Sequence, residues 1–153
     1  MQKIVGFYQK EANVSEDNFF VEIGESYLAC WVTTQQNELS AFEMFYFFNS
    51  AESCEEILHQ ALLYSTLLEK KWTIVKVIWN NNHVVCVPSF AFTETFLNEY
   101  LFFLGQPFHK ATCFYNKIHD NTIVFSVPEE WLKALNNRFI QVEYIHKHTC
   151  SFY

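Results

Sequence analysis

Three apolar segments separated by short polar turns lie near the start of the chain, and they restrict its fold more than any other feature. They span residues 19–23, 27–34 and 38–48, and aromatic and β-branched side chains are frequent in them, as in strands. Because turns of a few residues join antiparallel strands, the segments predict an antiparallel β-meander. The polar residues 1–18 before it are expected to form a leader that is either loose or an edge strand.

The rest of the chain alternates helices with strands. Ser53 and Glu56 have the spacing of a capping box, and the apolar stripe of the helix that they begin continues to Leu68, with lysines 70 and 71 at its expected end. The elements expected after this helix are a hairpin of strands 73–79 and 83–87, a helix over 94–104, a hairpin of strands 112–118 and 122–127, a helix from Pro128 to about residue 136, and a strand over 140–145. This order predicts an α/β fold with a mixed sheet, an antiparallel meander at its start and helices packed on it, in one domain over residues 19–153.

The composition narrows the classes of function. The chain has 153 residues, of which 17 are acidic and 10 basic, with a net charge of −7. Because nucleic-acid affinity depends on clustered Lys and Arg, no nucleic-acid partner is expected. The apolar runs are shorter than the ~20 residues that cross a bilayer, so no membrane partner is expected either. Five widely spaced cysteines indicate free thiols in a reducing compartment, and the expected location is cytoplasmic.

Four segments carry a resemblance to a known fold family. They are FFVEIGESYLACWV (19–32), VVCVPSFAFTETFLNEYLFF (84–103), DNTIVFSVPEEWLKAL (120–135) and the closing HKHT (146–149). Their pattern of apolar positions resembles the first lobe of a family of uncharacterised bacterial proteins with an actin-like ATPase fold, which is ribonuclease H-like. The resemblance implies that the chain is one such lobe, either the first half of a two-lobed protein or a one-lobed relative.

The same resemblance implies a candidate phosphate site. Actin-like ATPases bind phosphate at the turn between the first two strands, with an acid, a glycine and a hydroxyl residue, and here these would be Glu22, Gly24 and Ser26. Glu22 stands where an aspartate is usual, and Glu25 adds a negative charge where phosphate oxygens would lie. The sequence favours a glycine-containing hairpin turn with solvated acids over a phosphate-binding loop here. ATP and Mg²⁺ are expected only under the alternative that the chain is the nucleotide-binding half of such an ATPase.

No catalytic residues are predicted. Ribonuclease H-like nucleases need three or four carboxylates around two metal ions, and the chain has only two aspartates, Asp17 before the sheet and Asp120 in a hairpin turn. No G-x-S-x-G motif accompanies a candidate nucleophile. An enzymatic activity is therefore not expected.

The end of the chain offers a candidate metal site. His146, His148 and Cys150 alternate, so in an extended segment their side chains would lie on one face, as metal ligands could. The paired C-x-x-C spacing of closed zinc sites is absent from the sequence. A polar chain end with a partly buried Cys150 is the competing interpretation.

An excess of aromatic residues, 19% of the chain, points to an interaction surface. Phe45 and Phe47 follow Glu43 on one face of the third strand, and Phe102 and Phe103 lie off the main apolar stripe of the second helix. A second lobe or a homodimer mate would cover such side chains, although packing in the core would explain them equally. The leading hypothesis is a non-catalytic interaction or scaffold domain in the bacterial cytoplasm.

Overall fold

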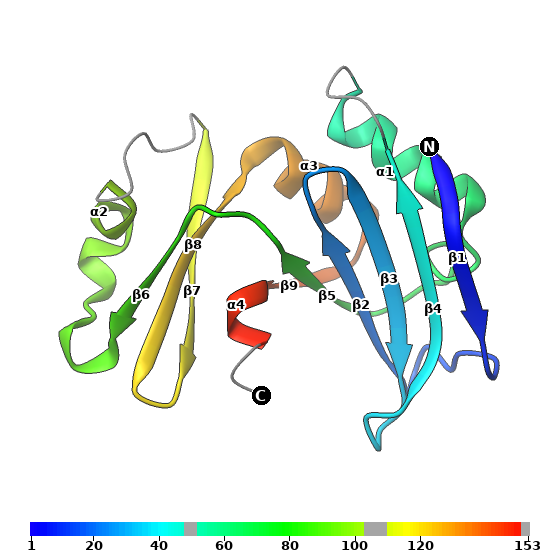
Figure 1. The fold of residues 1–153 in the computed structure, drawn as a ribbon, viewed down its shortest axis with the longest axis horizontal. Coiled ribbons are helices and arrows are strands. Elements are labelled where there is room, and N and C mark those ends of the chain that lie inside the picture. Colours follow the sequence, from blue (N-terminus) through cyan, green and yellow to red (C-terminus); the bar gives the residue numbers. More distant parts are fainter. Residues whose placement is uncertain (48–51, 103–109, 151–153) are drawn as a thin grey trace.

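The computed structural model describes residues 1–47, 52–102 and 110–150 (Figure 1). The strands are β1 (Gln2–Tyr8), β2 (Asn18–Ile23), β3 (Tyr27–Thr33), β4 (Leu39–Tyr46), β5 (Ile74–Trp79), β6 (Val84–Pro88), β7 (Ala111–Ile118), β8 (Asn121–Pro128) and β9 (Gln141–His146). The helices are α1 (Cys54–Tyr64), α2 (Leu97–Phe102), α3 (Glu129–Arg138) and α4 (Lys147–Cys150), with short 3₁₀ helices η1 (Ser89–Ala91) and η2 (Glu94–Phe96).

Six of these strands form a mixed sheet in the order β1-β4-β3-β2-β5-β9. The pairs β1–β4, β4–β3 and β3–β2 are antiparallel, whereas β2, β5 and β9 are parallel to one another. The predicted α/β fold with a β-meander at its start is therefore confirmed. Residues 2–8 of the leader form the edge strand β1 beside β4.

The predicted hairpin between residues 73–79 and 83–87 is wrong. β5 already has a parallel partner on each side, β2 and β9, so neither of its edges is free for β6. β6 instead pairs with β8 in a separate antiparallel sheet of order β6-β8-β7. The chain thus leaves the six-stranded sheet at the end of β5, builds the three-stranded sheet, and returns through α3 to β9 (Figure 1).

The second predicted hairpin is confirmed, because β7 and β8 pair from residue 111 to residue 128. His119 in its turn has a φ of 50°, a left-handed conformation that tight hairpin turns require.

Helix α1 begins as predicted and ends earlier. The Ser53 side chain accepts from the Glu56 amide, and the Glu56 side chain accepts from the Ser53 amide, which is the predicted capping box. The helix ends at Tyr64, because Ser65 is extended and its hydroxyl donates to the buried carboxylate of Glu43 on β4. Leu68 is buried although it is not helical, so its place in the apolar pattern did not require a helix.

The second predicted helix is shorter than expected. A 3₁₀ turn, η2, precedes α2, and Thr93 makes no side-chain capping hydrogen bond. Residues 103 and 104, at the expected end of this helix, lie outside the described residues.

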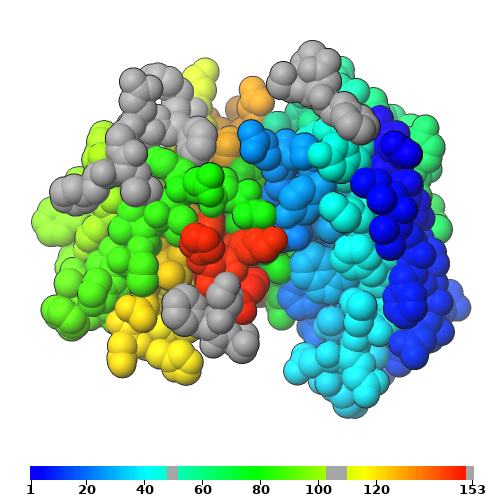
Figure 2. Space-filling model, viewed as in Figure 1, coloured from blue at the N-terminus to red at the C-terminus, as the bar shows by residue number. Residues whose placement is uncertain are grey.

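The core lies between one face of the six-stranded sheet and helices α1 and α3. Side chains from both layers form one buried cluster, which includes Phe19, Val21, Leu28, Phe45, Val77, Ile57, Ala61 and Leu135. Helix α2 packs on the three-stranded sheet through a smaller cluster around Leu101. We call the opposite face of the six-stranded sheet the open face; Figure 2 views it, with β2 to β4 in blue to cyan reaching the surface beside α4 in red.

Candidate functional site

A cleft of 1230 Å³ opens where the two sheets meet. Its walls come from the β2–β3 turn, the end of β5 with the asparagines that follow it, and the first residues of α1 and α3. Its lining includes three acidic side chains and two indoles, those of Glu25, Glu52, Glu130, Trp79 and Trp131. The fold thus brings together residues that are far apart in the sequence.

The structure divides the predicted phosphate-binding residues between two places. Gly24 and Ser26 line the cleft, but Glu22 is not among the lining residues and instead pairs with Lys147 at 2.8 Å on the open face. A Cβ at Gly24 would lie 2.1 Å from the Tyr27 ring. The need for glycine is therefore explained by the close packing of Tyr27, without any phosphate.

The charge of the cleft is negative. Among the residues that the structure describes, the carboxylates of Glu25, Glu52 and Glu130 line it, and no lysine or arginine does. Burial lowers the pKa of His83, the imidazole in the wall, so this side chain adds no positive charge at neutral pH. The cleft is electrostatically suited to a cation rather than to phosphate.

Two polar atoms in the wall are buried without a hydrogen-bond partner. One is the indole nitrogen Nε1 of Trp79, a donor in a side chain that is 6% exposed, and the other is the Oε2 oxygen of Glu52, an acceptor. Buried polar groups are almost always paired, because leaving one unpaired costs about 1–3 kcal/mol. Both atoms belong to residues that line the same cleft.

The predicted metal-binding residues do not form an extended row. The chain turns into helix α4 at Lys147, so His146, His148 and Cys150 no longer alternate along a strand. Both ring nitrogens of the buried His146 are engaged: Nδ1 accepts from the His148 amide at 3.1 Å, and Nε2 therefore donates to the Asn81 carbonyl at 3.0 Å. Within the described ranges, no group of three or more His, Cys, Asp or Glu residues is placed to hold a metal ion.

The predicted interaction surface is wrong for two of its four residues. Phe45 is 0% exposed and Phe47 is 6% exposed, because their face of β4 is the one that α1 and α3 cover. Phe102 is 59% exposed, and Phe103 lies outside the described residues. The alternation along the strand was correct, but it could not tell which of the two apolar faces meets the helices.

The open face carries one group of partly accessible aromatic side chains. Phe7, Phe42, Trp31 and Phe20 are direct neighbours across β1, β4, β3 and β2, and we call them the aromatic row. Ring centroids lie 6.3 Å apart between Phe42 and Trp31 and 5.5 Å apart between Trp31 and Phe20, and both pairs are stacked. The Lys76 ammonium on β5 lies 5.5 Å from the Phe20 ring and ends the row.

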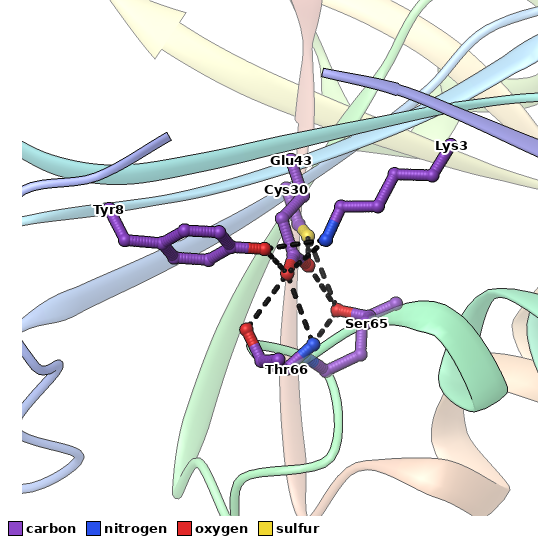
Figure 3. A network of polar contacts seen from close by, with 7 residues as sticks. Lys3, Tyr8, Cys30, Glu43, Ser65 and Thr66 are labelled. Atoms are coloured by element: carbon purple, nitrogen blue, oxygen red, sulfur yellow. Dashed lines mark hydrogen bonds and ion pairs between the residues drawn. The ribbon is translucent and has the colours of Figure 1, made fainter. Parts of the chain in front are cut away.

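A buried carboxylate lies on the covered side of the same sheet (Figure 3). Glu43 on β4 is 0% exposed, and its Oε1 accepts from the Thr66 amide at 3.0 Å, from Lys3 at 3.3 Å and from the Tyr8 hydroxyl. Its Oε2 accepts from the Ser65 hydroxyl. Three parts of the chain therefore converge on one side chain: the edge strand β1, the central strands, and the residues that follow α1.

The hydrogen bonds decide the charge of this carboxyl. Burial raises the pKa of Glu43, but donors from Ser65, Tyr8 and Thr66 outweigh it, and the pKa lies below its ordinary value. Burial and the nearby carboxylate raise the pKa of the Cys30 thiol, whose Sγ lies 3.5 Å from Oε2, well above its ordinary value. An ionised carboxylate beside a protonated, unreactive thiol is a structural arrangement.

Gly6 makes room for this network. It lies directly opposite Glu43 on β1, and a Cβ there would be 3.1 Å from Lys3 Cε and 3.3 Å from the Tyr8 ring. The network could not be predicted from the sequence, because a lone glutamate in an aromatic strand gives no sign of its partners. The available signal was the isolated charge itself, since a glutamate inside a buried strand needs donors.

The comparison with protein families decides where the chain belongs. The family described as "Protein of unknown function (DUF3822)" matches residues 9–152. The chain belongs to this family. No curated protein matches the sequence.

Solved structures show the fold of this DUF3822 chain. A crystal structure from Bacteroides thetaiotaomicron VPI-5482, of a protein with an actin-like ATPase fold and unknown function, superposes with a TM-score of 0.76 over 88% of this chain, at 14% identity. The chain spans about half of that protein, 53% of its length. The cytoplasmic domain of EpsL, an inner membrane component of the type II secretion system of Vibrio cholerae, has a TM-score of 0.47 at 17% identity, over 85% of this chain and 55% of its own. The superposition on the Bacteroides structure confirms the actin-like ATPase fold.

Two further findings on this DUF3822 chain concern membrane-spanning helices and the state of its cysteines. None of the helices that the structure describes is both long enough and apolar enough to cross a bilayer. All five cysteines, at positions 30, 54, 86, 113 and 150, are free thiols.

Proposed function

We propose that the chain is a non-catalytic interaction domain that binds another polypeptide on the open face of its six-stranded sheet. The observation that carries the proposal is the aromatic row, which crosses four neighbouring strands on a face where its rings stay partly accessible. Stacked aromatic rings supply much of the binding energy at protein interfaces, because they bury large areas at a small entropic cost. Lys76 and Glu22 would supply polar contacts at the margin of this surface.

The partner that we propose is a second folded lobe. The Bacteroides protein is about twice as long as the part that this chain matches, so a comparable length of polypeptide accompanies the matched half there. A lobe of that size is large enough to cover the open face of the six-stranded sheet, as α1 and α3 cover its opposite face. A second copy of this chain is the competing partner, and the bacterial cytoplasm, where free thiols persist, is the proposed setting.

Light scattering after size exclusion distinguishes the two partners. If a second lobe covers the open face, the isolated chain is monomeric and binds an apolar dye such as anilinonaphthalene sulfonate. If a second copy covers it, the chain is dimeric, and Phe42→Ser converts it to a monomer. A monomer that binds no dye would contradict both versions of the proposal.

A matched pair of variants assigns the dye to the open face. Phe42→Ser breaks the stacking with Trp31 and removes the middle of the aromatic row, so we expect it to lower dye fluorescence at least about twofold. Ile140→Ser removes a side chain that is exposed elsewhere, and we expect it to leave the signal unchanged. Equal effects of the two substitutions would show that the dye does not report on the row.

The second candidate function is the nucleotide-binding half of an actin-like ATPase, with ATP and Mg²⁺ as its ligands. The observation that favours it is that the N-termini of α1 and α3 both reach the cleft beside Gly24 and Ser26, and helix N-termini attract anions. Each terminus is equivalent to about half a positive charge, whereas three full negative charges line the cleft. The charge balance therefore opposes nucleotide.

A thermal shift with millimolar Mg-ATP tests this candidate. A ligand at 100 times its dissociation constant stabilises the folded state by about 2.7 kcal/mol, which raises the melting temperature by several degrees. We expect no rise. A rise that Gly24→Ala or Ser26→Ala abolishes would establish nucleotide binding and overturn the non-catalytic proposal.

A further inference from the structure

The cleft between the two sheets has a chemistry of its own, separate from the open face. We propose that it binds an organic cation that also carries an oxygen acceptor, the chemistry of an arginine or lysine unit, either free or within a peptide. The inference rests on three properties of its wall: net charge, unpaired polar atoms and aromatic surface. It does not depend on the proposed function of the open face.

The charge of the cleft favours a cationic ligand over an anionic one. Glu25 lies in the β2–β3 turn, Glu52 precedes α1 and Glu130 is in α3. Among the described residues, no lysine or arginine side chain lines the cleft to neutralise them. The Glu130 Oε2 oxygen accepts a weak hydrogen bond from the Cys54 thiol at 3.7 Å. Because the described residues hold no group suited to a metal ion, the complementary charge is better supplied by an extended organic cation.

The unpaired atoms define what the ligand must offer. Glu52 Oε2 needs a donor, which an ammonium or guanidinium group supplies. Trp79 Nε1–H needs an acceptor, which the carbonyl or carboxylate oxygen of an amino acid unit supplies. Glu52 keeps its other oxygen on the Gln60 amide at 3.3 Å, so the carboxylate is held in place while Oε2 stays unpaired. A cation that also carries an oxygen acceptor offers a matching group for each of the two atoms.

Aromatic side chains complete the wall. Trp79 and Trp131 lie edge to face with ring centroids 6.2 Å apart, and Tyr27 lines the cleft nearby, where its hydroxyl accepts from Asn80 at 2.8 Å. Aromatic rings attract cations and pack against the methylene chain of a basic side chain. The volume of 1230 Å³ accommodates a free amino acid and also a short peptide.

Isothermal titration of the full chain tests the proposal with matched ligands. L-arginine and acetyl-Gly-Arg-Gly-amide carry the cation free and within a peptide, and L-citrulline replaces the guanidinium by a neutral group of nearly the same shape. We expect at least one arginine ligand to bind about tenfold or more tightly than citrulline, since a charged hydrogen bond is lost with the charge. Binding of the peptide alone would identify a partner protein as the source, and binding of both would include the free amino acid. Equal affinity for arginine ligands and citrulline would overturn the proposal.

Variants locate the binding in the cleft. Glu52→Gln keeps the shape of the side chain and removes its charge, so we expect it to weaken arginine binding about tenfold or more. Glu38→Gln makes the same change of charge at an exposed turn outside the cleft, and we expect it to leave the affinity unchanged. Equal weakening by both substitutions would show a general attraction to this acidic protein and would overturn the proposal.

Discussion

Glu43 shows how much of this fold depends on one ionised side chain. Its carboxylate is removed from solvent, yet it accepts hydrogen bonds from residues before β4 and from residues after α1. Removing a partner of a buried, hydrogen-bonded charge typically costs 3–5 kcal/mol, because the remaining polar groups lose their match. The edge strand β1 and the segment after α1 are both attached to the sheet through this residue.

We therefore expect Glu43→Ala to lower the free energy of unfolding by about 3–5 kcal/mol, measured in urea at pH 7. The pKa of the folded carboxyl is lowered, so its contribution is present above the unfolded value of about 4.5 and is lost as the pH falls through the folded pKa. Glu43→Gln should accordingly lose less stability than the wild type between pH 5 and pH 3. An alanine variant within 1 kcal/mol of the wild type would contradict this account.

His146 gives a second dependence on pH, in a different range. Burial lowers the pKa of its imidazole to about 4, below the ordinary value of 6.5, so the unfolded chain binds a proton more readily. Stability is thus fully present above pH 6.5 and is lost as the pH falls towards 4, by about 2 kcal/mol between pH 7 and pH 5. His146→Gln should remove this dependence, whereas His59→Gln, at an exposed position on α1, should retain it. Urea titrations at the two pH values make the comparison.

At the scale of single elements, the β2–β3 turn requires glycine at position 24 because the Tyr27 side chain packs against it. A Cβ at Gly24 would overlap the Tyr27 ring, so Gly24→Ala should destabilise the fold by about 1–3 kcal/mol. In a Tyr27→Ala background the ring is absent, and the same substitution should cost less than about 1 kcal/mol. Melting temperatures of the four proteins in this cycle measure the coupling. Additive effects would show that the ring is not the reason for the glycine.

Local signals predicted most elements because their causes are local. The capping box at Ser53 and the turn at His119 depend on residues a few positions apart, and both appear as predicted. The end of α1 depends on Glu43, which holds the Ser65 hydroxyl from a different strand, so the sequence around Leu68 could not reveal it. The apparent hairpin of β5 and β6 failed for a similar reason, since the partners of β5 come from both ends of the chain.

The candidate site was predictable only in part. Sequence pattern singled out Gly24 and Ser26 at a turn, and both line the cleft. It could not show that Glu22 points to the other face, nor that Glu52 and Glu130 come to the same place. Those positions depend on the crossing between the two sheets, which no local pattern encodes.

At the scale of the whole molecule, the order of the strands predicts where the fold opens first. β5 is paired on both sides and largely buried, whereas β1 is an edge strand with mostly exposed side chains. We expect native-state hydrogen exchange to be slowest in β5, at the rate of global unfolding, and faster in β1, through local opening. Equal protection of the two strands would contradict this order and would imply that β1 has a partner in solution.

The three-stranded sheet is built from the segment of the chain between β5 and α3, and this position affects how related chains can differ. Residues 84–128 are inserted between two strands that remain neighbours, so the register of β5 with β9 does not depend on how long the insertion is. Phe125 and Val127 belong to the main core cluster, whereas the residues of the β7–β8 turn are not part of it. Related chains are therefore expected to tolerate changes of length at that outer end without a change in the pairing of β5 with β9.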